Sequence, residues 1–271
     1  MLHIQKTDSF DDPNLAPYRT MRQQQEHREQ GIFVAEGEKL VRRLLESRLT
    51  VVSLLLPEKW FRDLQPLLET RPEEVHVYVA EKRLLEQLTG FSMYQGLLAV
   101  GKIPPLASLD QVCRQSESPR LLVAVDELSN AENLGAVVRN CGAFGVQALI
   151  VGETSCSPYL RRAVRGSMGV IFHLPVVETR SLVESLLALR QQGVRCIAAH
   201  PHAGSQILSR CNLAADCCLV FGSEGYGISP RVLEACDEAV AIPMPPHVDS
   251  LNVGSAAAVF LYEANRQRGS T

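Results

Sequence analysis

The sequence predicts an α/β protein of two domains, the second built on a mostly parallel sheet. Short aliphatic runs alternate with amphipathic helical segments along almost the whole chain, and this alternation is typical of α/β folds. Runs in the second half, such as LLVAV and CCLVF, are apolar throughout, which is typical of strands covered on both faces. Residues 106–119 lose this periodicity and gain Pro and Ser. They predict a linker between domains 1–105 and 120–271.

The composition is that of an ordinary soluble globular protein. The chain has 271 residues, 46% hydrophobic and 21% charged, and no apolar run reaches the roughly 18 residues of a membrane helix. Residues 1–12 resemble neither a signal peptide nor a transit peptide, so we expect a cytoplasmic protein without a membrane partner. The formal net charge of −3 restricts nucleic-acid binding to local patches.

The eight cysteines all lie at or after Cys113, mostly within apolar segments, and no C-x-x-C pair is present. This arrangement argues against a zinc site and indicates small buried side chains. We therefore expect no bound metal.

The first domain is predicted to contain four helices and four strands. The helices are expected over residues 13–30, 37–48, 57–71 and 81–90, and the strands over 32–35, 51–56, 75–80 and 97–103. Gly31 ends the first helix, and the proline at 57 begins the third.

The second domain is predicted to be a parallel sheet with helices on both faces. Its strands are expected over 121–128, 147–152, 171–177, 194–201, 217–222 and 239–243, and its helices over 133–145, 157–166, 181–193 and 228–237. A last helix follows Asp249 or Ser250, either of which would be a natural N-cap. Its apolar face comprises Val253, Ala257, Phe260, Leu261 and Ala264.

Three polar patches follow strands of the second domain, where open α/β sheets bind ligands. The first contains Asn133 and Arg139, the second is the glycine-rich stretch 222–227, and the third is the S-L-N stretch 250–252. Each patch alone is also explained by structure: a helix cap, a tight turn and a capped core helix. Their common position predicts one cleft.

Two common nucleotide-binding classes are excluded by motif. The glycines of G-S-E-G-Y-G stand at 222, 225 and 227, which is the wrong spacing for the G-x-G-x-x-G of a dinucleotide-binding dehydrogenase. The chain also lacks a Walker lysine.

The patches, taken in order, resemble the three motifs of the SpoU/TrmH branch of SPOUT methyltransferases. The matching stretches are N-x-x-N-L-G-A-V-V-R-N-C-G-A-F-G, L-V-F-G-S-E-G-Y-G-I-S and I-P-M…S-L-N-V-x-x-A-A-A-V-F-L-Y-E, within 120–271. The segment RRAVRGSMG is similar to the family's R-x-S-x-G segment. REQGIFVAEGEKLV and LTGFSMYQGLLAV resemble, less specifically, the ribosomal-protein-like RNA-recognition domain of many members.

The resemblance implies methyl transfer from S-adenosyl-L-methionine to a ribose 2′-hydroxyl of structured RNA, with ribosomal RNA favoured over transfer RNA. It also implies a deep C-terminal trefoil knot, an exception to the rule against knots, and a homodimer formed through the C-terminal domain. The alternative is a non-catalytic RNA-binding or ribosome-assembly protein that keeps the fold.

The resemblance also implies roles for particular residues. Arg139 would either act as an unusual base or hold the adjacent phosphate and the alkoxide, and electrostatic positioning is favoured because a guanidinium stays protonated in proteins. Glu224 would orient Arg139. The predicted catalytic residues are Arg139, Asn133, Glu224, Ser250 and Asn252. The predicted cofactor-binding residues are Gly222, Ser223, Gly225, Ile242, Met244, Leu251 and Asn252. The predicted RNA contacts are Arg28, Lys39, Arg161, Arg162, Arg165 and Ser167, and Tyr226 is a candidate for base stacking.

Overall fold

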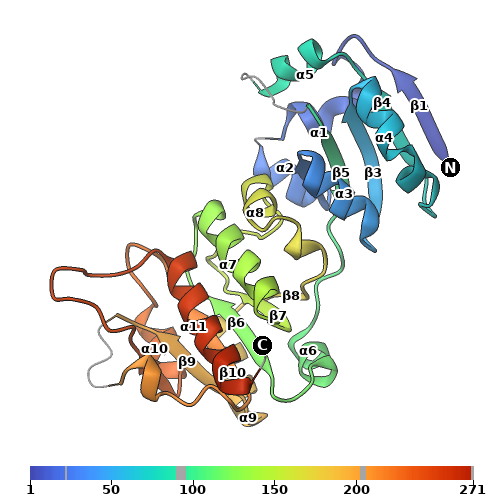
Figure 1. Ribbon diagram of the computed structural model, residues 1–271. Coiled ribbons are helices and arrows are strands. Elements are labelled where there is room, and N and C mark those ends of the chain that lie inside the picture. The colour runs from blue at the N-terminus through green and yellow to red at the C-terminus, as the bar shows by residue number, and fades with distance from the viewer. Residues whose placement is uncertain (22, 90–95, 202–205, 270–271) are drawn as a thin grey trace. The chain divides into compact units, whose positions relative to one another are not determined.

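The computed structural model describes residues 1–21, 23–89, 96–201 and 206–269. The chain forms two compact units (Figure 1). Unit 1 comprises Met1–Pro105 together with Tyr159–His173, and unit 2 comprises Leu106–Pro158 together with Leu174–Thr271. The segment 159–173 was predicted to belong to the second domain, but it packs within unit 1. Part of the predicted RNA-domain stretch 88–100, namely 90–95, lies outside the described residues.

Unit 1 is a five-stranded mixed sheet of order β1-β4-β3-β5-β2. β3 runs parallel to β4 and antiparallel to β5. Its elements are β1 (Leu2–Lys6), η1 (Pro13–Leu15), α1 (Ala16–Arg19), α2 (Gln24–Glu29), β2 (Ile32–Glu36), α3 (Glu38–Glu46), β3 (Val51–Leu56), α4 (Glu58–Glu69), β4 (Val75–Val79), α5 (Lys82–Thr89), β5 (Leu98–Lys102), α8 (Arg161–Gly166) and η2 (Val170–Phe172).

Three sequence predictions for these segments are wrong. β1 was not predicted, because it is an edge strand with a mostly exposed burial pattern. The helix predicted over 13–30 is three short helices, since Pro13 begins the first and Pro17 lies in the first turn of the second. Over 171–177 the chain forms η2 and then β8 (Val176–Glu178), which begins only after Pro175. A proline has no N–H to donate to a ladder.

Unit 2 is a six-stranded, all-parallel sheet of order β11-β9-β10-β6-β7-β8, which confirms the predicted α/β class. Its elements are α6 (Leu109–Gln115), β6 (Leu121–Val125), α7 (Ala131–Ala143), β7 (Ala148–Val151), β8, α9 (Leu182–Gln191), β9 (Arg195–Ala199), η3 (Leu208–Arg210), β10 (Cys217–Phe221), α10 (Pro230–Ala235), β11 (Glu238–Val240) and α11 (Val253–Arg268).

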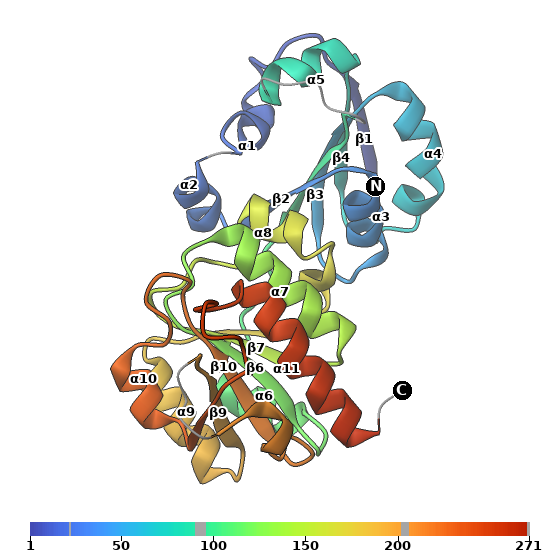
Figure 2. The same ribbon diagram turned by 60° about the vertical axis from the view of Figure 1, so that its left-hand side comes forward.

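Helices cover both faces of this sheet (Figure 2). α6, α9 and α10 share one core cluster with the strands, while α7 packs against α11. β6 and β10 are neighbours at the centre, and the connections lead away from them in opposite directions. The carboxyl ends of β6 and β10 therefore lie at the switch point of the sheet, where open α/β sheets bind ligands.

The predicted linker is not unstructured. It contains α6, whose N-cap Ser108 forms a capping box with Gln111. Val112 and Cys113 of this helix are buried in the core of unit 2. Seven residues are too few to show a clear helical periodicity, so the sequence pattern missed this helix.

The cysteines are free thiols, six of them buried and two half-buried. Burial raises the pKa of Cys217 to about 11 and of Cys236 to about 12. These thiols are therefore protonated at neutral pH, as expected for apolar core residues. The described residues include no group of side chains that could hold a metal ion. None of the helices described here is both long and apolar enough to cross a membrane.

Candidate active site

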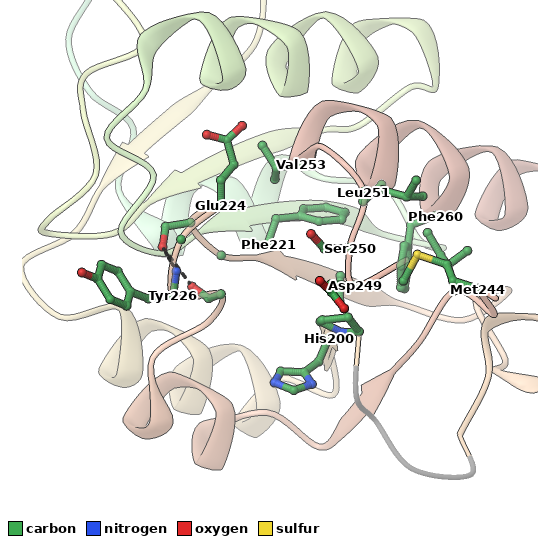
Figure 3. A pocket seen from close by; sticks show the side chains of 18 of the residues that line it. His200, Phe221, Glu224, Tyr226, Met244, Asp249, Ser250, Leu251, Val253 and Phe260 are labelled. Atoms are coloured by element: carbon green, nitrogen blue, oxygen red, sulfur yellow. Dashed lines mark hydrogen bonds between the residues drawn. The ribbon is translucent and has the colours of Figure 1, made fainter. Parts of the chain in front are cut away.

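A cavity of about 400 Å³ lies at the carboxyl ends of β9, β10 and β11 in the unit 2 sheet (Figure 3). Segments that follow β9, β10 and β11 form its sides, together with the first turns of α11. Its apolar lining residues are Ala199, Phe221, Val240, Ile242, Met244, Leu251, Val253, Ala256 and Phe260, and its polar side chains are those of His200, Ser223, Glu224, Tyr226, Asp249 and Ser250. Apolar surfaces with a few polar groups are typical of a small-molecule site.

The glycine-rich loop after β10 is closed upon itself. The amide of Ser223 donates to the carbonyl of Gly227, and the amide of Gly227 donates to the carbonyl of Ser223, both at 2.9 Å. A Cβ atom on Gly222 would lie well under 3.0 Å from the backbone of Gly227, so the two limbs of the loop approach each other only because residue 222 is glycine. The loop therefore presents backbone groups directly to the cavity.

A buried carboxylate fixes the end of this loop. Asp126, directly after β6, is 4% exposed, and its Oδ2 accepts a hydrogen bond of 2.7 Å from the amide of Ser229. The amide of Asp126 donates to the carbonyl of Phe221 at 2.8 Å. Asp126 thus connects the ends of the two central strands. Asp126 was not among the predicted site residues, although its position after a buried strand was a usable signal.

Asn252 lies at the N-terminus of α11, the helix that follows the third polar patch. Its Oδ1 accepts from the amide of Gly254 at 2.9 Å, so Asn252 is the N-cap of α11. The prediction of Asp249 or Ser250 as N-cap is wrong, because the chain is not yet helical there and both residues line the cavity instead. The predicted apolar face is confirmed, since all five of its residues are buried.

Three of the predicted catalytic side chains form one polar cluster, defined as Asn133, Glu224 and Asn252. Asn252 Nδ2 donates to Asn133 Oδ1 and to Glu224 Oε1, each at 3.0 Å. Asn133 Nδ2 also donates to Glu224 Oε1. The cluster joins α7, the loop after β10 and the N-terminus of α11, and Glu224 connects it to the cavity.

Arg139 stands apart from this cluster. It is exposed, and the described structure shows no ion pair between its guanidinium and Glu224. The prediction that Glu224 orients Arg139 is therefore wrong for this structure, because Glu224 is engaged by the two asparagines. Arg139 lies six residues after Asn133, which on a helix is about 9 Å further along the axis and on a different face.

The predicted cofactor residues converge on the cavity. Those that line it are Gly222, Ser223, Gly225, Ile242, Met244 and Leu251, while Asn252 belongs to the polar cluster. Ser250, predicted as catalytic, is also a lining residue. His200 also lines the cavity and follows β9 directly, but it was not among the predicted site residues. The end of a predicted parallel strand was the available signal.

The predicted RNA contacts differ in how exposed their side chains are. Ser167 is only 1% exposed, and its hydroxyl donates to the carbonyl of Val164 at 2.8 Å. Arg161 forms a largely buried ion pair with Glu36. These positions argue against the prediction that Ser167 and Arg161 contact RNA, because packing within unit 1 buries Ser167 and pairs Arg161 with Glu36. Arg162 and Arg165 are exposed.

Arg28 and Lys39, the two predicted contacts in the first half of the chain, are also exposed and lie in unit 1.

Comparison with known proteins shows which family has this fold. Residues 120–262 match the model of the SpoU rRNA methylase family. An uncharacterised tRNA/rRNA methyltransferase of Synechocystis sp. is 30% identical over 98% of this chain and 95% of its own length. The AdoMet complex of the SpoU methyltransferase AviRb from Streptomyces viridochromogenes is similar in structure, with a TM-score of 0.82 and 26% identity over 96% of this chain and 99% of that chain. A structure described as an RNA 2′-O ribose methyltransferase has a TM-score of 0.79 and 26% identity over 99% of both chains.

The parallel sheet, the cavity at the carboxyl ends of its strands and these matches define an RNA methyltransferase that uses S-adenosylmethionine as cofactor. The chain belongs to the SpoU rRNA methylase family. The residues present fit the cofactor. The cavity has apolar sides for a flat heterocycle and exposed loop backbone for its polar edge, and Asp249 and Glu224 bring negative charge to a ligand that carries a sulfonium cation.

Proposed function

We propose that the protein methylates a ribose 2′-hydroxyl of structured RNA, with ribosomal RNA favoured over transfer RNA as substrate. The observation that carries this proposal is the polar cluster beside the cofactor cavity. The structural neighbour described as an RNA 2′-O ribose methyltransferase supports the choice of acceptor. The family name and the second compact unit, available for a large structured RNA, support the choice of substrate.

When bound, S-adenosylmethionine supplies an activated methyl group, so the protein needs no nucleophile of its own. The chain must orient the ribose and stabilise negative charge that develops on its 2′-oxygen. In this proposal, Glu224 is held in place by Asn133 and Asn252 and, together with Ser250, positions the hydroxyl. Preorganised polar groups of this kind typically change a rate by ~10²–10³.

Arg139 supplies the positive charge in this proposal. It projects from α7, the helix that carries Asn133, and its side chain is exposed and available to an RNA phosphate or to the developing alkoxide. An arginine is protonated at any working pH, so it acts by electrostatic stabilisation rather than by accepting the proton.

The test uses tritiated S-adenosylmethionine with unmodified ribosomal and transfer RNA pools, followed by digestion and separation of nucleosides. Label in 2′-O-methylated nucleosides from ribosomal RNA is the expected result. Arg139→Ala should lower the rate at least about 100-fold and leave cofactor affinity within about threefold. Arg231→Ala, which removes another exposed arginine of unit 2, is the matched control and should retain transfer.

Other results of this experiment distinguish the alternatives. Label in a methylated base would reject the ribose acceptor. Cofactor binding without transfer to either pool, or to ribosomal particles, would favour the non-catalytic RNA-binding alternative. An active Arg139→Ala enzyme would remove Arg139 from the mechanism.

We also propose that unit 1 contributes to RNA binding through exposed cations that include Arg28, Lys39 and Arg162. Each phosphate contact should add about one to the slope of log affinity against log salt concentration. Filter binding of ribosomal RNA fragments by Lys39→Ala at several salt concentrations tests this, and an unchanged slope would contradict a phosphate contact at that residue.

The C-terminal domain is proposed to form a homodimer. Val259 and Tyr262 of α11 are 39% and 61% exposed, and Leu251, just before this helix, is 40% exposed. Val259 and Tyr262 lie one turn apart, on the face of α11 away from its buried residues. Light scattering should show a dimer, and Val259→Glu should yield a monomer.

The trefoil knot implied by the family is part of the same proposal. α11 packs closely on α7: a Cβ on Gly254 would lie 2.8 Å from the Cβ of Ala136. Asn140 Nδ2 donates to the carbonyl of Gly254 at 2.6 Å. Small residues at this crossing suit a C-terminal segment that passes through a loop. Slow refolding from strong denaturant, accelerated in a circular permutant that unties the chain, is the expected result.

A further inference from the structure

A second hollow, of about 330 Å³, lies beside the cofactor cavity. Both are lined by the loop residues Ser223, Glu224, Gly225 and Tyr226. The opposite side of the second hollow is formed by Glu127–Asn130, which follow β6, and by Thr154, which follows β7. The loop after β10 therefore separates two spaces, and the proposed function accounts for only one of them.

The side chain of Tyr226 lines this second hollow. Its side chain is 91% exposed, and Figure 3 shows it pointing away from Phe221, Phe260 and Met244 of the cofactor cavity. The loop that carries Tyr226 is held in one conformation by hydrogen bonds. Ser223 and Gly227 exchange two backbone hydrogen bonds, and the amide of Tyr226 donates to Ser223 Oγ at 3.3 Å.

The other side of the hollow offers polar groups that a ligand can reach. Glu127 has a φ of 53°, a left-handed conformation that a glutamate rarely adopts and that is often found at functional sites. No hydrogen bond or ion pair engages its carboxylate in the part of the chain that the structure describes. Asn130 uses its Oδ1 to cap α7, accepting from the amides of Glu132 and Asn133, so its amide group remains available to donate.

We infer that this second hollow binds a nucleobase of the substrate RNA, stacked on the ring of Tyr226. A base presents a flat face for stacking and polar groups at its edge. The carboxylate of Glu127 accepts only, so it selects bases with an exocyclic amino group, namely adenine, cytosine or guanine, over uracil. The inference rests on the proposed function for the identity of the polymer. Tyr226 and Glu127 would thus contribute to the choice of base and not to methyl transfer.

The experiment measures RNA affinity apart from catalysis. Fluorescein-labelled RNA oligomers of adenylate, cytidylate or uridylate, matched in length, are titrated with the full-length protein, and binding is followed by anisotropy. Wild type should bind the adenylate and cytidylate oligomers more tightly than the uridylate oligomer. Tyr226→Ala should weaken binding of the adenylate oligomer by roughly 5- to 100-fold, the range that loss of one stacked base gives. Tyr226→Phe keeps the ring and should stay within about twofold.

Two further readouts separate stacking from charge and from folding. Tyr226→Ala should leave the salt dependence of RNA affinity unchanged, because no phosphate contact is lost, and its thermal unfolding midpoint should match that of wild type, because the ring is exposed. Glu127→Gln should reduce the difference between adenylate and uridylate oligomers. A Tyr226→Ala protein with wild-type affinity for every oligomer, or Glu127→Gln with wild-type base preference, would overturn the inference.

The result is distinguishable from failure of the proposed function. If wild type transfers no methyl group but Tyr226→Ala still weakens RNA binding, the base site stands and ribose methylation does not. If wild type methylates ribose and Tyr226→Ala has an unchanged KM for ribosomal RNA, the base site is rejected while the proposed function stands.

Discussion

Replacement of Gly222 by alanine is the sharpest test of the cofactor site. The added Cβ would lie well under 3.0 Å from the backbone of Gly227 and from the amide nitrogen of Ile228. These are backbone atoms, so the clash cannot be relieved by a change of rotamer. Gly225 lies in the same loop, but a Cβ there would meet nothing within 4 Å.

The magnitude follows from what must move. Restoring an ordinary carbon–carbon separation of about 3.5 Å requires the two limbs of the loop to separate. Separation breaks the two hydrogen bonds of 2.9 Å between Ser223 and Gly227, each worth about 0.5–1.5 kcal/mol. Overpacking adds about 1–3 kcal/mol. If cofactor binding must restore the native loop, even about 2 kcal/mol lowers affinity by about 30-fold.

Calorimetric titration with S-adenosylmethionine measures this effect. Gly222→Ala should lose at least about 30-fold in affinity, whereas Gly225→Ala, which leaves the backbone N–H groups in place, should stay within about threefold. Thermal unfolding of both variants checks that the rest of the fold is intact. Binding by Gly222→Ala within about threefold of wild type would refute the argument that the loop backbone holds the cofactor.

Three further predictions concern stability and the position of α11. Arg268 donates to the backbone carbonyls of Pro119, Arg120, Leu213 and Ala215, so Arg268→Ala should lower the free energy of unfolding in urea by about 2–4 kcal/mol; a loss below about 0.5 kcal/mol would contradict this. Although burial by itself raises the pKa of Asp216, hydrogen bonds from Ser118 and Arg120 hold it below its usual range. The stabilising effect of the Asp216 carboxylate is therefore complete above the unfolded pKa of about 4 and is lost as pH falls below it. Asp216→Asn should be less stable than wild type at pH 7 and equally stable near pH 2. A difference in stability that does not depend on pH would contradict this role of the Asp216 charge. In Gly254→Ala the added Cβ would lie 2.8 Å from the nearest side chain of α7. This variant should shift α11 and weaken cofactor binding by about 5- to 100-fold. Unchanged binding would show that α7 accommodates the added methyl group without moving the cofactor site.

Local sequence patterns located many of the residues that line the cavity. Glycine spacing around Ser223, the S-L-N stretch before a helix and the apolar strands of unit 2 are features of one short segment each. In a parallel sheet all such segments end at one edge. The pattern alone therefore assigns Gly222 and Leu251 to one site, although they are 29 positions apart in the chain, and both line the cavity.

Partners of charged and polar side chains could not be derived in this way. Glu224 was assigned to Arg139, but it binds Asn133 and Asn252, which come from two different helices. Arg161 and Ser167 were assigned to RNA, but within unit 1 Arg161 is paired with Glu36 and Ser167 is buried. A hydrogen bond is decided within a few tenths of an ångström, whereas a pattern places a side chain only on a face.

The sequence by itself thus determined the fold class, the family and the edge of the sheet where the cavity lies. Periodicity depends on contacts within one segment, which the sequence pattern records directly. Only the tertiary structure decided which side chains meet: the polar cluster around Glu224, the buried carboxylate of Asp126 under the loop, and the hollow between Tyr226 and Glu127. Each of these depends on the packing of segments distant in the chain, because a side chain's partner is whichever group that packing brings within reach.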